Sequence, residues 1–223
     1  MRMMIMGAMR LTPGVLALMA LVGQVLPAAA DEACEARIRA MFDGGPLDPF
    51  VRPAHEYTNT VSAADGTEKY RFLVRMVSPV QSVAGIVGQG PFSMVIGSDS
   101  WTGPSIDGPW TAANNALPED HMAHQRSLHE QQTANLERMS CEGMVDLDDA
   151  PHDVVRFFTK TDPNPDMGDA WFGSDHRVFI DPETNRVMRW EMTQFVNSFS
   201  DGVSDDRHVL VYRYDDAIRI ERP

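Results

Sequence analysis

The chain has 223 residues, of which 43% are hydrophobic and 23% are charged, and its formal net charge is −13 at pH 7. A balance this acidic argues against nucleic acid and anionic membrane surfaces as partners, because proteins bind both through Lys and Arg. The length suits one domain with a sizeable core.

The N-terminus resembles a cleaved targeting segment over residues 1–30. Arg2 and Arg10 form a positive n-region, residues 15–26 are an apolar run, and Ala28-Ala29-Ala30 fits an A-x-A cleavage site. The apolar run is short for a membrane span. We therefore expect an exported, periplasmic protein with no stable membrane insertion. Without the two arginines, the net charge changes from −13 to −15.

Two cysteines, Cys34 and Cys141, lie in the expected mature domain of residues 31–223. Cys34 lacks the small apolar residues that precede a lipidated cysteine. In an exported chain the pair predicts a disulfide, the alternative being two buried thiols. Such a bond would close a loop of roughly a hundred residues and tie the N-terminal segment to the body of the protein.

The first half of the mature chain predicts a short helix followed by antiparallel strands. Ile38, Met41 and Phe42 share one side of a helix over residues 34–42, and a Gly-Gly-Pro sequence ends it. The strands expected in this half are residues 55–62 and 68–77, joined by an Asp65-Gly66 turn, and the alternating segment 92–96.

The second half begins with a long helix predicted over residues 118–139. Pro118 suits the first helical position, and the acidic residues that follow it suit the first turn. Few large apolar side chains lie on this helix, so it is only weakly amphipathic. The strands expected after it are residues 144–147, 154–160, the hairpin 177–192 and 207–215, with Ile218 and Ile220 closing the sheet.

The hairpin indicates which face of the sheet is buried. Val178 and Ile180 alternate with polar or outward positions, and Met188, Trp190 and Met192 do the same after a turn made of Asp, Pro and Asn. One face is therefore apolar and large. The sequence predicts an α+β fold: a curved antiparallel sheet of eight to ten strands, with one long and one short helix on its apolar face.

Three segments resemble the LolA/LppX-like superfamily of periplasmic lipid and lipoprotein carriers. They are VFIDPETNRVMRWEM at residues 178–192, DGPW at residues 107–110 and YRYDDAIRIERP at residues 212–223. The order of helices and strands and the placement of the two cysteines are similar as well. The resemblance implies an unclosed half-barrel whose concave apolar face takes acyl chains under a helical lid, without covalent chemistry or a cofactor.

A set of ten residues is expected to form the ligand-binding face. Eight of them share the in-facing parity of consecutive strands, and two belong to the long helix above them. This helix offers too few apolar residues to cover the face, so a lipid or the acyl chain of a lipoprotein would fill the remaining space. The ten residues are Phe72, Val74, Met94, Ile96, Met122, Leu128, Met188, Trp190, Leu210 and Tyr212.

Two other classes of function stay open. A structural or interaction protein of the cell envelope would have the same sheet with a fully packed core, and envelope proteins are possible partners of a carrier too. A hydrolase with an unrecognised site is the weaker alternative. The chain has no G-x-S-x-G elbow and no C-x-x-C motif, so a non-catalytic protein is expected.

Two groups of possible metal ligands are set aside. The groups are His121, His124 and His129, and Asp162, Asn164 and Asp166. The histidines do not converge on one face of a helix. The acidic group starts like a calcium loop but lacks its turn glycine and its bidentate glutamate. We expect no metal.

Overall fold

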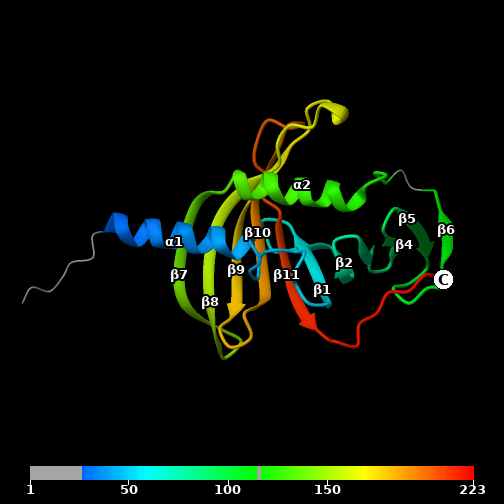
Figure 1. Ribbon diagram of the computed structural model, residues 1–223, viewed down its shortest axis with the longest axis horizontal. Coiled ribbons are helices and arrows are strands. Elements are labelled where there is room, and N and C mark those ends of the chain that lie inside the picture. Colours follow the sequence, from blue (N-terminus) through cyan, green and yellow to red (C-terminus); the bar gives the residue numbers. More distant parts are fainter. Residues whose placement is uncertain (1–26, 115–116) are drawn as a thin grey trace, which may run out of the picture.

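All strands of the described residues belong to one antiparallel sheet. The structure, a computed structural model, describes residues 27–114 and 117–223. These residues form a sheet of eleven strands in the order β6-β5-β4-β3-β2-β1-β11-β10-β9-β8-β7, which curves without closing into a barrel (Figure 1). The predicted α+β fold with a curved antiparallel sheet is confirmed.

Two α-helices and one 3-10 turn accompany the strands in the described part of the chain. The helices are α1 (Pro27–Phe42) and α2 (His121–Ala134), and the 3-10 turn is η1 (Pro165–Met167). The strands are β1 (His55–Ser62), β2 (Glu68–Ser78), β3 (Gln81–Ile86), β4 (Gln89–Ile96), β5 (Asp99–Gly103), β6 (Thr111–Ala113), β7 (Glu137–Leu147), β8 (Ala150–Lys160), β9 (Phe172–Asp181), β10 (Arg186–Asn197) and β11 (Arg207–Tyr214).

Helix α2 is shorter than predicted. It begins after Asp120, whose side chain accepts a hydrogen bond from the Ala123 amide at 2.8 Å, as an N-cap should. It ends at Ala134, so the prediction that the helix continues to Met139 is wrong. Glu137 already pairs with Phe158 of β8, and this pairing extends β7 into the region expected to be helical.

The strands differ from expectation in number and at the C-terminus. Strands β3, β5 and β6 were not predicted as separate strands, because they are short and lie among turns rich in glycine. Ile218 and Ile220 do not close the sheet as a strand. They lie in an irregular tail, where both side chains are at least 93% buried.

The main hydrophobic core lies between α1 and the concave face, by which we mean the face of β7–β11 that α1 covers (Figure 1). Ile38, Met41 and Phe42 of α1 pack there, as the helical spacing predicts. Val155 and Val178, both fully buried, lie opposite each other on β8 and β9. Helix α1 was predicted as the short helix but with 16 residues is longer than α2, which has 14, and it covers the apolar side of the hairpin.

A disulfide joins α1 to β7, the strand at one edge of the sheet. The Cys34 and Cys141 sulfurs are bonded, and both residues pack against the main core, so the predicted pairing is confirmed. Residues 1–26 of the expected targeting segment lie outside the described residues, and α1 starts at Pro27. Among the described helices, none has the length and apolar character to cross a bilayer.

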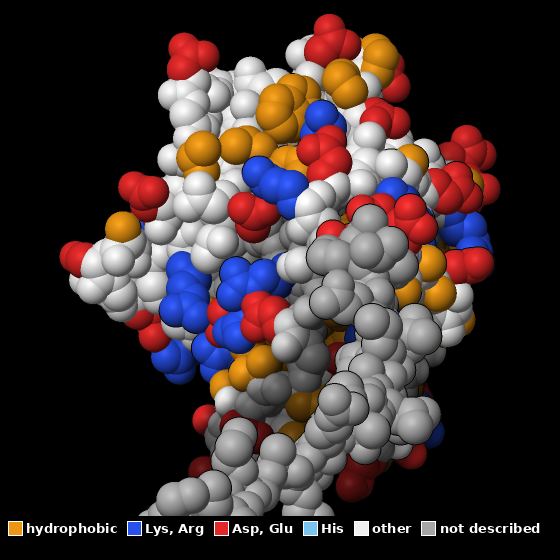
Figure 2. Space-filling view, turned by 90° about the vertical axis from the view of Figure 1, so that its left-hand side faces the viewer, with side chains coloured by type: hydrophobic (Ala, Val, Ile, Leu, Met, Phe, Trp, Pro, Cys, Tyr) orange, Lys and Arg blue, Asp and Glu red, His pale blue; other side chains and the backbone are white. Residues whose placement is uncertain are grey.

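The outer face of β7–β9 carries arginines paired with carboxylates. Glu142 accepts hydrogen bonds from Arg177 at 2.7 Å and from Arg156, and Asp175 accepts one from Arg138 at 2.8 Å. Arg177 also lowers the pKa of the Glu142 carboxyl, which keeps this group ionised. Figure 2 shows basic side chains gathered beside acidic ones on the side of the molecule that carries β7. This face is charged and exposed, in contrast to the concave one.

Candidate functional site

A cavity of about 250 Å³ lies where both helices, one loop and four strands meet on the concave face. Its lining is mostly apolar and aromatic, with a few polar groups among them, the composition typical of small-molecule sites. The lining residues are Phe42, Leu47, Pro49, Arg52, His129, Gln132, Phe157, Thr159, His176, Trp190, Met192, Leu210 and Tyr212.

Three of the predicted ligand-binding residues line this cavity. Trp190 of β10 lies directly opposite Leu210 of β11, and Tyr212 lies two residues further along the same strand. Because alternate residues of a strand share a face, all three side chains point to the concave side. The hairpin periodicity therefore places the right residues of β10 and β11 together.

A buried histidine fixes the orientation of Trp190. The Trp190 indole N–H donates a hydrogen bond to His176 Nδ1 at 2.8 Å, so the neutral ring carries its proton on Nε2, 3.0 Å from Ser174 Oγ. The imidazole also stacks on Phe157, with ring centroids 4.9 Å apart. Burial lowers the pKa of His176 to about 3, so the ring stays uncharged at neutral pH.

Arg52 supplies the positive charge of the cavity. Its guanidinium carbon lies 5.7 Å from the centre of the Trp190 ring and 5.6 Å from that of the Tyr212 ring, within the range of cation–π contacts. Nε and Nη2 donate to the Pro46 carbonyl at 3.3 and 3.2 Å. Burial raises the pKa of the Tyr212 hydroxyl, and the charge of Arg52 opposes that rise. The arginine therefore stands beside the aromatic wall of the cavity.

Helix α2 closes the cavity with polar side chains. His129 Nε2 donates to the Phe42 carbonyl at 2.8 Å, and its ring stacks on that of Phe42. Gln132 lines the cavity as well, and its backbone carbonyl accepts a hydrogen bond from the Thr159 hydroxyl. These contacts hold α2 over β8, but they bring amide, imidazole and hydroxyl groups to the cavity instead of an apolar surface.

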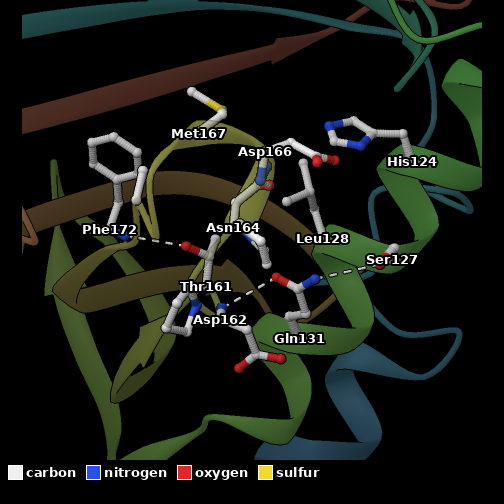
Figure 3. Close-up of a pocket in the computed structure, with 13 residues that line it drawn as sticks. His124, Ser127, Leu128, Gln131, Thr161, Asp162, Asn164, Asp166, Met167 and Phe172 are labelled. Carbon is white, nitrogen blue, oxygen red and sulfur yellow. Dashed lines mark hydrogen bonds between the residues drawn. The ribbon is translucent and has the colours of Figure 1, made fainter.

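The two residues predicted from the long helix lie elsewhere. Met122 is 37% exposed and does not line the cavity. Leu128 lines a separate cleft of about 470 Å³ between α2 and residues 161–172 (Figure 3). There Gln131 accepts a hydrogen bond from the Asp162 amide at 3.1 Å, which joins α2 to the loop. Met122 and Leu128, which were predicted to belong to the ligand-binding face, therefore do not line the same cavity as Trp190.

The prediction that all eight strand residues share one face is wrong for Met94 and Ile96. Val74 pairs with Ala84, and Ala84 pairs with Ser93. Paired residues of neighbouring strands point to the same face, so on β4 the odd-numbered residues face the concave side and the even-numbered Met94 and Ile96 face away from it. Met94 is 1% exposed and packs on the opposite face in a second core, where Ile220 of the C-terminal tail covers it. Met94 is therefore part of a packed interior.

The remaining predicted residues lie on or beside the concave face without lining the cavity. Tyr57 of β1 pairs with Tyr212 on one side and with Val74 of β2 on the other. Asn59 of β1 pairs in the same way with Leu210 and with Phe72 of β2. Met188 lies at a β-bulge between Val187 and Arg189 and is not among the residues that pack against the main core. Strand β1 thus separates Phe72 and Val74 from the three predicted residues that line the cavity.

Several of the residues that the sequence analysis set aside as metal ligands make contacts within the fold. The Asn164 side chain caps η1 by accepting a hydrogen bond from the Asp166 amide at 3.0 Å, and Asp162 accepts one from Asn135 at 2.7 Å. His121 contacts the Gly97 carbonyl at 2.9 Å. Within residues 27–114 and 117–223, no three His, Cys, Asp or Glu side chains are grouped as metal ligands would be.

Several cavity residues were not among the predicted ligand contacts. His176 has the same parity as Val178 and Ile180, so the hairpin pattern could have identified it. Phe157 likewise belongs to a strand segment that was expected. Arg52 lies in the loop between α1 and β1, where no periodicity points to a site. The strand residues of the cavity wall could therefore be predicted from the sequence, whereas the positive charge of Arg52 could not.

The lining of the cavity offers few reactive side chains. Both ring nitrogens of His176 face hydrogen-bond partners within the protein, and its pKa is far below neutral, so it is a poor general base. The described lining of the cavity contains no Ser, Cys, Asp or Glu side chain. What the lining offers is an apolar wall, one guanidinium group and a few other polar groups.

Solved structures of low sequence identity resemble the fold. No protein-family model and no curated protein matches the sequence. The lipoprotein LppX of Mycobacterium tuberculosis is 12% identical with a TM-score of 0.48 and covers 86% of this chain and 100% of its own. LprF of Mycobacterium bovis is 11% identical with a TM-score of 0.48, and the match covers 84% of this chain and 97% of LprF. A LolA superfamily protein of Nitrosomonas europaea is 13% identical with a TM-score of 0.30, over 78% and 90% of the two chains.

Proposed function

We propose that this protein binds a hydrophobic ligand, such as a lipid or an acyl chain, in the cavity under α2 and does not transform it. The observation that carries the proposal is the space itself: a cavity of about 250 Å³ on the concave face, lined by Trp190, Leu210 and Tyr212 among others. Each methylene buried there contributes about 0.8 kcal/mol to binding. Phe157 and Met192 extend the apolar wall, and methionine adapts to ligands of different shape.

The site also belongs, in this proposal, to an exported protein that works in the periplasm as a single domain of residues 31–223. The disulfide supports this location, because such bonds persist in oxidising compartments and are rare in the cytosol. The charged n-region and apolar run at the N-terminus are the features expected of an export signal.

A pair of substitutions on neighbouring residues of β11 tests the proposal. Leu210 is 8% exposed and lines the cavity, whereas Val211 is 53% exposed on the other face. Leu210→Trp should fill the cavity and weaken binding of a fluorescent fatty-acid probe by at least about tenfold, the loss expected when two methylenes are displaced. Val211→Trp adds the same side chain to the surface and should leave binding unchanged.

The outcome depends on comparison of the two variants. Urea unfolding must show that both are folded under the assay conditions, since overpacking a core costs about 1–3 kcal/mol. If wild-type protein does not bind the probe, or if both variants bind it equally well, the cavity is not a ligand site and the proposal fails.

One observation favours a role in protein interaction as a second candidate. Three apolar side chains at the start of β9 and on the loops next to β9 and β10 are between 52% and 66% exposed: Met167, Phe172 and Phe199. Phe172 and Phe199 also contact each other, with ring centroids 5.8 Å apart. Exposed apolar side chains grouped in this way mark interaction surfaces in other proteins. Phe199→Ser should abolish binding to such a partner while leaving probe binding intact.

A further inference from the structure

Arg52 is a charge without a carboxylate partner. Fourteen close contacts between basic and acidic groups occur among the described residues, and none includes Arg52. The undescribed residues 1–26 and 115–116 contain no Asp or Glu. Every acidic residue of the chain is therefore accounted for, and none neutralises this guanidinium group within 4.0 Å.

Part of the hydrogen-bonding capacity of Arg52 is unused. A guanidinium group carries five N–H donors. Two nitrogens of Arg52, Nε and Nη2, share a single acceptor, the Pro46 carbonyl. A side-chain hydrogen bond between Arg52 and the Tyr212 hydroxyl also opposes the rise in the pKa of Tyr212, which leaves about two of the five N–H groups without a protein acceptor. A partly buried cation with free donors favours an anion that accepts two parallel hydrogen bonds, and carboxylate and phosphate both have this geometry.

The surroundings of Arg52 match an amphiphilic molecule. On one side, the guanidinium group faces the rings of Trp190 and Tyr212, which belong to the apolar wall. On the other, the same cavity contains the polar side chains of Gln132 and Thr159. A volume of about 250 Å³ is below the 300–1,000 Å³ of common ligand pockets, so it suits one hydrocarbon chain better than a lipid with several.

We infer that the ligand is a single-chain amphiphile with an anionic head group, whose carboxylate or phosphate binds Arg52 while its chain occupies the cavity. This inference rests on the proposed function and narrows it to one chemical class of ligand. Arg52 then has two roles: it holds the loop before β1 through Pro46, and it selects charged ligands over neutral ones of the same length.

Three ligands with the same chain and different heads test the inference: dodecanoate, dodecyl phosphate and dodecan-1-ol. Calorimetry on wild-type protein at neutral pH should show that at least one anion binds about tenfold or more tightly than the alcohol, because hydrogen bonds to charged groups are worth that much. A preference for dodecyl phosphate identifies a phospholipid-type head group, and a preference for dodecanoate identifies a fatty acid.

Substitutions assign this selectivity to Arg52. Arg52→Met should lower the affinity for the preferred anion about tenfold and leave the affinity for dodecan-1-ol nearly unchanged, while Arg52→Lys should restore part of the difference. Arg126 serves as the matched control: its guanidinium group lies 4.4 Å from the centre of the Phe50 ring, outside the cavity lining. Arg126→Met should keep the wild-type selectivity.

The possible failures are distinct. If wild-type protein binds all three ligands equally, the inference is wrong but the proposed function stands. If Arg52→Met loses the alcohol as strongly as the anion, Arg52 acts only by holding the loop, and the inference is wrong again. If wild-type protein binds none of the three, the proposed function itself fails.

Discussion

Removal of the Cys34–Cys141 disulfide should strongly destabilise the protein. The bond joins residues 107 positions apart, and closing a loop of that length stabilises the folded state by about 5 kcal/mol in the chain-entropy model. Domains of ordinary stability unfold at a cost of about 5–15 kcal/mol, so this is a large share. With a urea dependence of about 2–3 kcal/mol per molar, the unfolding midpoint should fall by about 2 M urea.

The measurement is urea unfolding followed by circular dichroism on the Cys34→Ala/Cys141→Ala variant and on wild-type protein with and without reductant. Alanine keeps the two positions apolar where they contact the main core. Reduced wild type should unfold at the same midpoint as the variant, and reductant should not change the variant. A double variant with the midpoint of oxidised wild type would refute the reasoning, because loop closure would then contribute nothing.

Two further predictions concern pH and the C-terminal tail. Burial lowers the pKa of His176 to about 3, so the unfolded chain takes up this proton first as the pH falls below about 6.5, and stability decreases. Between pH 7 and pH 5 this group should cost about 2 kcal/mol, so His176→Gln should lose about 2 kcal/mol less than wild type in urea titrations at the two pH values. The loss from His55, whose pKa burial lowers to about 4, remains in both proteins. Ile220→Ala, in the tail that covers the second core, should cost about 2–5 kcal/mol in the same assay, whereas Arg222→Ala at the surface should cost at most about 1 kcal/mol. Equal midpoints for these last two variants would show that the tail does not stabilise the sheet.

Local patterns in the sequence determined much of the fold. Period-two alternation identified β2 and the β9–β10 hairpin, because a half-buried strand must alternate apolar and polar residues. The same alternation placed Trp190, Leu210 and Tyr212 on one face, and the pairing of β10 with β11 then brought them together. The two cysteines of an exported chain predicted the disulfide.

Only the tertiary structure decided where the concave face continues and what closes it. Register between strands depends on the turns that join them, and a shift of one residue sends a side chain to the other face. The tight turn between β3 and β4 pairs Val83 with Met94, and this pairing removes Met94 from the ligand face. Pairing with β8 converted the expected end of α2 into strand β7. Arg52 reaches the cavity from an irregular loop, whose path depends on the packing of α1 and not on any repeat in the sequence, so the charge that we propose to select the ligand became visible only in three dimensions.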